Sequence, residues 1–129
     1  MEPIYTIVYV ADVPASIAFY RTLFGKDPVH ASDGFGMFML ENGTAWGLWK
    51  RTDVLPPSTS EPGAAEYCFG ISSREALDAL AADWKKQGIP VIQDPVDLDF
   101  GYTFTALDPD GHRLRPFVPA PQTAAADRA

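Results

Sequence analysis

The spacing of apolar and polar residues changes its period twice within the first fifty positions of this chain. Residues 5–11 alternate as a half-buried strand does, and apolar residues then recur every three or four positions up to Gly25, as in a helix packed on one side. Asp12 is placed to cap this helix and Gly25 to end it. Apolar stretches beyond Gly25 predict three further strands, at residues 28–31, 35–41 and 44–50.

The same order of elements returns after residue 63, as one strand, a helix that ends at Gly88, and three more strands. The predicted strands are residues 65–71, 90–94, 100–107 and 112–118. Ser72 and Glu75 have the spacing of a capping box at the start of the helix. A repeat of this length is a supersecondary unit. The sequence therefore predicts an α+β fold of duplicated βαβββ modules that form a cupped mixed sheet with the helices on the outside.

The modules are expected at about residues 4–50 and 64–118, within a single domain that spans residues 1–119. Each module ends in a hairpin, around Asn42-Gly43 in the first copy and Asp108-Pro-Asp-Gly111 in the second. The intervening segment, residues 51–63, is rich in Pro, Ser and Thr and is expected to be a linker. Residues 120–129 are expected to form a disordered tail.

Composition restricts the kinds of partner. The 129 residues are 47% hydrophobic and carry a net charge of −7 without a basic run, which argues against a nucleic-acid partner. No apolar run approaches the roughly 20 residues of a membrane span, and the N-terminus lacks the pattern of a signal peptide. Cys68 is the lone cysteine, which fits a reducing compartment. We expect a cytoplasmic protein that handles a small molecule or a protein partner.

Two motifs set in the duplicated βαβββ pattern carry a family resemblance. Val10-Ala-Asp-Val-Pro-Ala-Ser-Ile-Ala-Phe-Tyr20 and Asp108-Pro-Asp-Gly-His-Arg-Leu114 resemble the vicinal-oxygen-chelate superfamily, which includes glyoxalases, extradiol dioxygenases and bleomycin-resistance proteins. Within it, Leu23-Phe-Gly-Lys-Asp-Pro28 and Asp99-Phe-Gly-Tyr-Thr-Phe104 are most similar to phenazine-antibiotic-resistance proteins. Those proteins bind a flat tricyclic antibiotic without catalysing a known reaction. The resemblance covers about residues 3–119.

The resemblance also identifies the positions at which the superfamily's enzymes hold a divalent metal. They use His, Glu or Gln from the first and last strand of each copy, and the matching residues here are Tyr5, Gly47, Glu66 and Arg115. A phenol, a missing side chain, one carboxylate and a permanent cation do not make a metal-ligand set. We therefore expect no metal and no other cofactor.

Glu66 and Arg115 are expected to face each other, because the first and last strands of a βαβββ unit are neighbours. Two interpretations of this pair stay open. In the first, the guanidinium of Arg115 binds a carboxylate or amide of a ligand. In the second, Glu66 and Arg115 form an ion pair with each other and fill the space that a metal occupies in the related enzymes.

The four positions that the resemblance identifies are expected to face the concave side of the cupped sheet, and strand alternation adds further residues to this side. Trp49 shares the face of Gly47, whose missing side chain leaves room for a ligand ring, and an indole favours stacking with planar molecules. Trp46 then points to the helix. Trp49 as core or as dimer interface is the alternative. The expected ligand-binding residues are Tyr5, Tyr9, Phe38, Trp49, Glu66, Phe100, Tyr102 and Arg115. The face of Phe38 depends on a hairpin register in which a slip of one residue swaps the faces.

The function that these features favour is metal-independent binding and sequestration of a planar aromatic small molecule, such as a phenazine-like antibiotic, by a homodimer. No residues are expected to be catalytic, because no Ser, Cys and His constellation is present. The alternative is an enzyme of the same superfamily. It would be a metal-dependent lyase or oxygenase, or a metal-free isomerase that uses Glu66 as its base.

Overall fold

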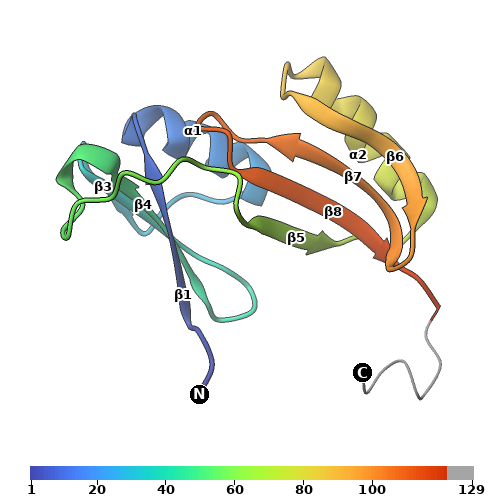
Figure 1. Cartoon of the computed structure of the whole chain (residues 1–129), viewed down its shortest axis with the longest axis horizontal. Helices are drawn as coiled ribbons and strands as arrows, with labels where there is room; N and C mark the ends of the chain where they lie inside the picture. The colour runs from blue at the N-terminus through green and yellow to red at the C-terminus, as the bar shows by residue number, and fades with distance from the viewer. Residues whose placement is uncertain (122–129) are drawn as a thin grey trace. The chain divides into compact units, whose positions relative to one another are not determined.

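The computed structural model describes residues 1–121, which divide into two compact units between Glu61 and Pro62. Each unit contains one long helix and one four-stranded mixed sheet (Figure 1). The α+β class and the duplicated βαβββ module are therefore confirmed. The division falls inside the segment expected to be a linker. The expected tail lies outside the described residues from position 122 onward.

The first unit has the element order strand, helix, strand, strand, strand. Its elements are β1 (Tyr5–Val10), α1 (Val13–Phe24), β2 (His30–Ala31), β3 (Phe35–Met39), β4 (Ala45–Lys50) and the short 3-10 helix η1 (Arg51–Asp53). The strand order is β1-β4-β3-β2, with β1 parallel to β4 and the other pairs antiparallel. As predicted, Asp12 caps α1, its carboxylate accepting from the Ala15 N–H at 3.0 Å, and Gly25 ends it at φ 68°.

Helix α1 covers one face of this sheet. The ring of Tyr20 lies 5.4 Å from the ring of Trp46, and the ring of Phe24 lies 5.4 Å from that of Phe38. Val8 and Leu48 are buried on the same side. The even-numbered residues of β1 and β4 therefore form the core of the first unit, and the predicted orientation of Trp46 towards the helix is correct.

The second unit repeats this order. Its elements are β5 (Glu66–Gly70), α2 (Arg74–Lys86), β6 (Val91–Leu98), β7 (Gly101–Leu107) and β8 (Arg113–Pro119). The strand order is β5-β8-β7-β6, with β5 parallel to β8. The helix begins one residue later than predicted, because Ser73 is its cap and accepts from the Ala76 N–H at 3.1 Å. The capping box expected at Ser72 is therefore wrong.

Helix α2 lies along its own sheet and meets β6, β7 and β8 (Figure 1). Leu77, Ala81 and Trp84 are its buried residues, and the ring of Trp84 packs 5.2 Å from that of Phe104 in β7. The even-numbered residues of β7 thus face the helix. Neither α1 nor α2 has the length and apolar character of a membrane span, and no other helix in residues 1–121 does.

Strand β6 is longer than the sequence predicts, reaching Leu98 instead of ending near residue 94. Its pairing with β7 is irregular on both sides of Gln93, and Val96 is the next residue to pair. Proline lacks the N–H that a regular ladder requires, and such irregularities accommodate it. Pro95 therefore interrupts the register without ending the strand.

Beyond β8 the chain stays attached to the sheet for one more residue, because the Ala120 N–H donates to the Phe100 carbonyl at 2.9 Å. Gly101 lies next to this hydrogen bond and has φ 154°. A Cβ placed on it would lie 2.1 Å from the Val118 carbonyl oxygen. Only glycine allows this close backbone approach. Ala120 is therefore bonded to the fold, although it belongs to the segment expected to be disordered.

Candidate functional site

Each sheet has one face covered by its helix and a second face that its own helix does not cover. In the first unit we call this second face the first open face. Its side chains come from alternate residues of β1, β3 and β4, and they are Tyr5, Ile7, Tyr9, Phe35, Met37, Met39 and Trp49. Seven large apolar or aromatic side chains on one surface are a candidate for binding a flat, apolar partner.

Trp49 lies on the first open face, as strand alternation predicts. Its ring is 6.3 Å from that of Tyr9 at an interplanar angle of 79°, which is an edge-to-face contact. Tyr9 and Trp49 are paired neighbours on the parallel strands β1 and β4. This contact restrains the indole, and Trp49 itself is only partly buried.

Gly47 sits beside Trp49 but does not leave the free space that the sequence interpretation assigned to it. A Cβ at this position would lie 2.8 Å from Cε1 of Tyr5 and 3.2 Å from Cζ of Phe35. Two protein rings therefore occupy the space above Gly47. Partial burial raises the pKa of the Tyr5 phenol, which stays neutral at physiological pH.

The second unit presents a different surface, which we call the second open face. It centres on Arg115 in β8, whose Nε donates to Oε1 of Glu66 in β5 at 2.8 Å. Nη1 of Arg115 donates to Oε1 of Gln93 in β6 at 3.1 Å and to Oγ1 of Thr103 in β7 at 3.4 Å. The expected pairing of Glu66 with Arg115 is present. Side chains from the three other strands of the sheet thus hold one guanidinium in a fixed orientation.

Aromatic rings flank this polar group. The ring of Phe100 lies 5.8 Å from that of Phe117, and Cζ of Arg115 is 5.6 Å from the centre of the Phe100 ring. Phe100 is 44% exposed. The second open face therefore combines an oriented cation–carboxylate pair with an exposed ring, and both hydrogen bonding and apolar contact are available to a ligand there.

Cys68 is the neighbour of Arg115 across the β5–β8 pairing. Its pKa is raised, mainly because burial disfavours the thiolate and further because Glu66 is near, while Arg115 opposes the shift. The thiol is therefore protonated at neutral pH, which is the state of an unreactive cysteine.

Two of the expected site residues lie on the helix side of their sheets. Phe38 is fully buried against Phe24 of α1, because the register of β3 places it opposite Trp46 and not opposite Gly47. Tyr102 donates its O–H to Oδ1 of Asp78 in α2 at 2.7 Å. We therefore remove both residues from the candidate faces.

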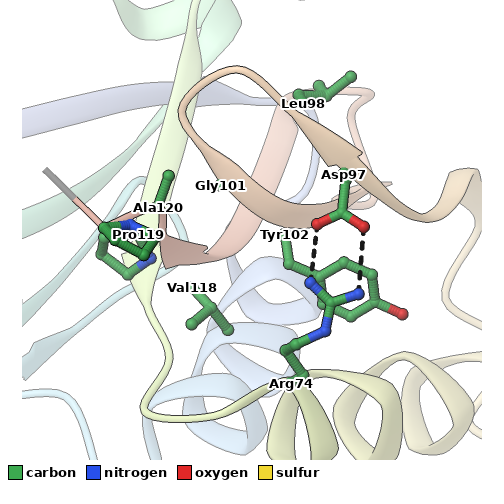
Figure 2. Close-up of a pocket in the computed structure, with 9 residues that line it drawn as sticks. Arg74, Asp97, Leu98, Gly101, Tyr102, Val118, Pro119 and Ala120 are labelled. Atoms are coloured by element: carbon green, nitrogen blue, oxygen red, sulfur yellow. Dashed lines mark hydrogen bonds and ion pairs between the residues drawn. The ribbon is translucent and has the colours of Figure 1, made fainter.

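Tyr102 instead belongs to a small cluster at the start of α2, which Figure 2 shows. The guanidinium of Arg74 stacks 3.9 Å above the Tyr102 ring and makes two hydrogen bonds to Asp97, at 2.7 and 3.1 Å. The cluster lines a shallow pocket of about 280 Å³ together with Leu98 and the end of β8. Its charged groups satisfy each other, so the cluster connects α2 to β6 and β7.

Sequence reasoning missed two polar members of the second open face. Thr103 has the same strand parity as Gly101 and could have been found by alternation along β7. Gln93 could not, because the irregular register of β6 hides its orientation. Together they hold the guanidinium of Arg115, and Thr105 adds a hydrogen bond to Gln93 at 3.3 Å.

The positions that would hold a metal in related enzymes do not fit one. In the first unit the ring of Tyr5 covers Gly47, and in the second the carboxylate of Glu66 is bonded to a permanent cation. Zinc, iron or manganese requires several converging nitrogen, sulfur or carboxylate donors. Across residues 1–121 no three His, Cys, Asp or Glu side chains are grouped closely enough to supply them.

Comparison with known proteins gives a family-level match. The model of the Glyoxalase/Bleomycin resistance protein/Dioxygenase superfamily matches residues 4–115. The phenazine antibiotic resistance protein EhpR of Enterobacter agglomerans is 33% identical over 118 residues, covering 89% of this chain and 90% of its own.

Solved structures give the same result for the fold. Protein ATC0852 of Agrobacterium tumefaciens is 43% identical with a TM-score of 0.86, over 94% of this chain and 99% of its own. A glyoxalase-related enzyme of Fulvimarina pelagi shares the fold at 18% identity with a TM-score of 0.81, over 98% of this chain and 95% of its own.

Proposed function

Because the chain belongs to the Glyoxalase/Bleomycin resistance protein/Dioxygenase superfamily, we propose that it binds a planar aromatic small molecule without the help of a metal. The ligand is a phenazine-like antibiotic, and binding protects the cell by sequestering it in the cytoplasm. The similarity to a phenazine antibiotic resistance protein over nine-tenths of both chains supports this ligand class.

The observation that carries the proposal is the partly exposed indole of Trp49 on the first open face. Its ring makes an edge-to-face contact with that of Tyr9, and the neighbouring side chains are aromatic or apolar. A fixed aromatic ring in apolar surroundings stabilises a flat ligand by stacking and by burial of apolar area. The oriented Arg115 and the ring of Phe100 give the second open face the means to contact a polar aromatic ligand as well.

Catalysis by Glu66 is less well supported than binding. A metal-free isomerase needs a carboxylate that is free to accept a proton from its substrate. Oε1 of Glu66 instead accepts a charge-assisted hydrogen bond from Arg115 at 2.8 Å. Using Glu66 as a base would require this bond to break.

Metal independence leads to a direct experiment. Protein expressed in zinc- and manganese-supplemented medium is expected to contain far less than one equivalent of divalent metal, and phenazine titration should give the same dissociation constant before and after EDTA treatment. Elemental analysis and tryptophan quenching measure these two quantities. A tightly held metal near one equivalent, whose removal abolishes phenazine binding, would contradict the proposal. Absence of phenazine binding in both samples would contradict the proposed ligand.

We also propose that the protein is a homodimer. Tyr5, Ile7 and Met39 on the first open face are 38–40% exposed, and contiguous apolar surface of this kind usually marks an interface. Light scattering coupled to size exclusion should give twice the 14.1 kDa chain mass at micromolar concentration. A constant monomer mass across the concentration range would show that this face is not a dimer contact.

A further inference from the structure

The amide of Gln93 is held in one orientation by its neighbours on the second open face. Its Oε1 accepts from Nη1 of Arg115 at 3.1 Å and from Oγ1 of Thr105 at 3.3 Å. Because an arginine side chain only donates, the oxygen of the amide and not its nitrogen must face Arg115. The Nε2 group of Gln93 is thereby turned away from both contacts, and within residues 1–121 it has no hydrogen-bond partner.

The polar side chains that hold this amide are buried and bonded themselves. Thr103 is 0% and Thr105 1% exposed. Oγ1 of Thr103 donates to the Pro116 carbonyl at 2.8 Å and accepts from Nη1 of Arg115 at 3.4 Å. Gln93 is half-buried, so its amide is accessible while its orientation is fixed. A ligand that reaches Nε2 therefore meets a preorganised donor.

The side-chain acceptor atoms close to Gln93 are already in use. Its own Oε1 accepts two hydrogen bonds. The carboxylate of this face, Glu66, belongs to β5, which lies on the other side of β8 from β6. Nη2 of Arg115 is a second N–H group to which the described part of the chain offers no acceptor. What remains for a ligand beside Gln93 is a pair of donors.

A ligand at this place must therefore supply acceptor atoms. Ring nitrogens, carbonyl oxygens and carboxylates all accept hydrogen bonds from N–H groups. A ligand that presents an N–H group instead would place donor against donor. Both groups would then lose their bonds to water without replacement, which is unfavourable.

We propose that Gln93 is a specificity-determining residue whose Nε2 donates to an acceptor atom in the plane of the ligand, so that aromatic molecules with such an acceptor bind in preference to those with an N–H donor. The inference rests on the proposed binding of a planar aromatic molecule. Arg115 and Thr105 position the amide. The ring of Phe100, 5.6 Å from the guanidinium carbon of Arg115, supplies apolar contact nearby.

Gln93→Glu separates the donor from the structural role of the side chain. The carboxylate has nearly the shape of the amide and keeps an oxygen for Arg115 and Thr105, but a second acceptor oxygen replaces the Nε2 group. Phenazine and carbazole are flat three-ring molecules, of which phenazine has acceptor ring nitrogens and carbazole has an N–H donor. The ratio of the phenazine dissociation constant to that of carbazole should rise about tenfold over wild type, or about 1.4 kcal/mol, in equilibrium dialysis.

Asn42→Asp is the matched control. It makes the same exchange of amide for carboxylate in the hairpin of the first unit, where Oδ1 of Asn42 accepts from the N–H and the Oγ1 of Thr44. The ratio of the two dissociation constants should stay as in wild type. An unchanged ratio in Gln93→Glu, or an equal loss of both compounds by the folded variant, would overturn the inference and leave the proposed function intact. If wild type bound neither compound, the proposed function would fail and this inference with it.

Nuclear magnetic resonance tests the same contact in wild type, without any variant. The chain has three glutamines and one asparagine, so the side-chain amide signals are few. Titration with phenazine should shift the Nε2 proton signals of Gln93 downfield, because these protons form a new hydrogen bond, and leave those of Asn42 in place. Unshifted Gln93 signals at saturating phenazine would show that this amide does not contact the ligand.

Discussion

Replacing Trp49 by alanine is expected to weaken phenazine binding about a hundredfold, or roughly 2–3 kcal/mol, while the protein stays folded. The loss combines the stacking contribution of the indole with the apolar contact that it makes. The fold should survive because Trp49 lies on the first open face and not in the core between sheet and helix. Its ring contacts that of Tyr9 on the neighbouring strand. Isothermal titration calorimetry gives the affinity, and circular dichroism monitors the fold.

Trp46→Ala is the control from the same strand. Trp46 is 5% exposed and packs on Tyr20 and Phe24, so its truncation should lower the free energy of unfolding by about 3–5 kcal/mol. Its effect on ligand affinity should be small in the fraction that remains folded. Normal binding by Trp49→Ala together with lost binding by a folded Trp46→Ala protein would show that the ligand does not contact the first open face.

Replacing Gly101 by alanine is expected to destabilise the second unit by about 3 kcal/mol or more, because a strained backbone and a steric clash act together. The residue has φ 154°, and the new Cβ would lie 2.1 Å from the Val118 carbonyl oxygen and 3.1 Å from the Ala120 nitrogen. Both nearby atoms are backbone atoms and cannot rotate away. Urea denaturation should show a lower midpoint.

Gly70→Ala serves as the comparison within the same sheet. A Cβ added at Gly70 would have no atom of a neighbouring residue within 4 Å, and the residue has no positive φ. Its substitution should change the free energy of unfolding by less than about 0.5 kcal/mol. If Gly101→Ala were as stable as Gly70→Ala, the close approach of β7 to the end of β8 would be disproved.

Much of the fold could be predicted because local signals in this chain agree with one another. Asp12 and Gly25 bound α1 where the helical spacing begins and ends. The orientation of Trp46 and Trp49 followed from strict alternation along β4. The start of α2 was misplaced because Ser72 and Ser73 offer the same capping side chain. The actual cap is set by long-range pairing, in which the Ile71 N–H donates to the Phe117 carbonyl.

The candidate site was harder to predict, for reasons that particular residues make clear. Both parities of β3 carry large apolar side chains, so the sequence alone could not place Phe38 on the helix side. Phe100 and Tyr102 are two positions apart and would share a face in a regular strand. The positive φ of Gly101 breaks that alternation and separates them, leaving Phe100 beside Phe117 while Tyr102 reaches Asp78.

Alternate residues of one strand lie on different faces of the sheet, and this has a consequence for how the protein can evolve. In β4, Trp46 and Leu48 are core residues, whereas Gly47 and Trp49 belong to the opposite face. Substitutions at Trp49 are largely decoupled from core packing and therefore change stability little, whereas a side chain at Gly47 must displace the ring of Tyr5 on the same face. A lineage can exchange the chemistry of its open faces one position at a time while selection on the core keeps the scaffold. Metal-binding enzymes and metal-free binders can then descend from the same duplicated module without passing through an unfolded intermediate.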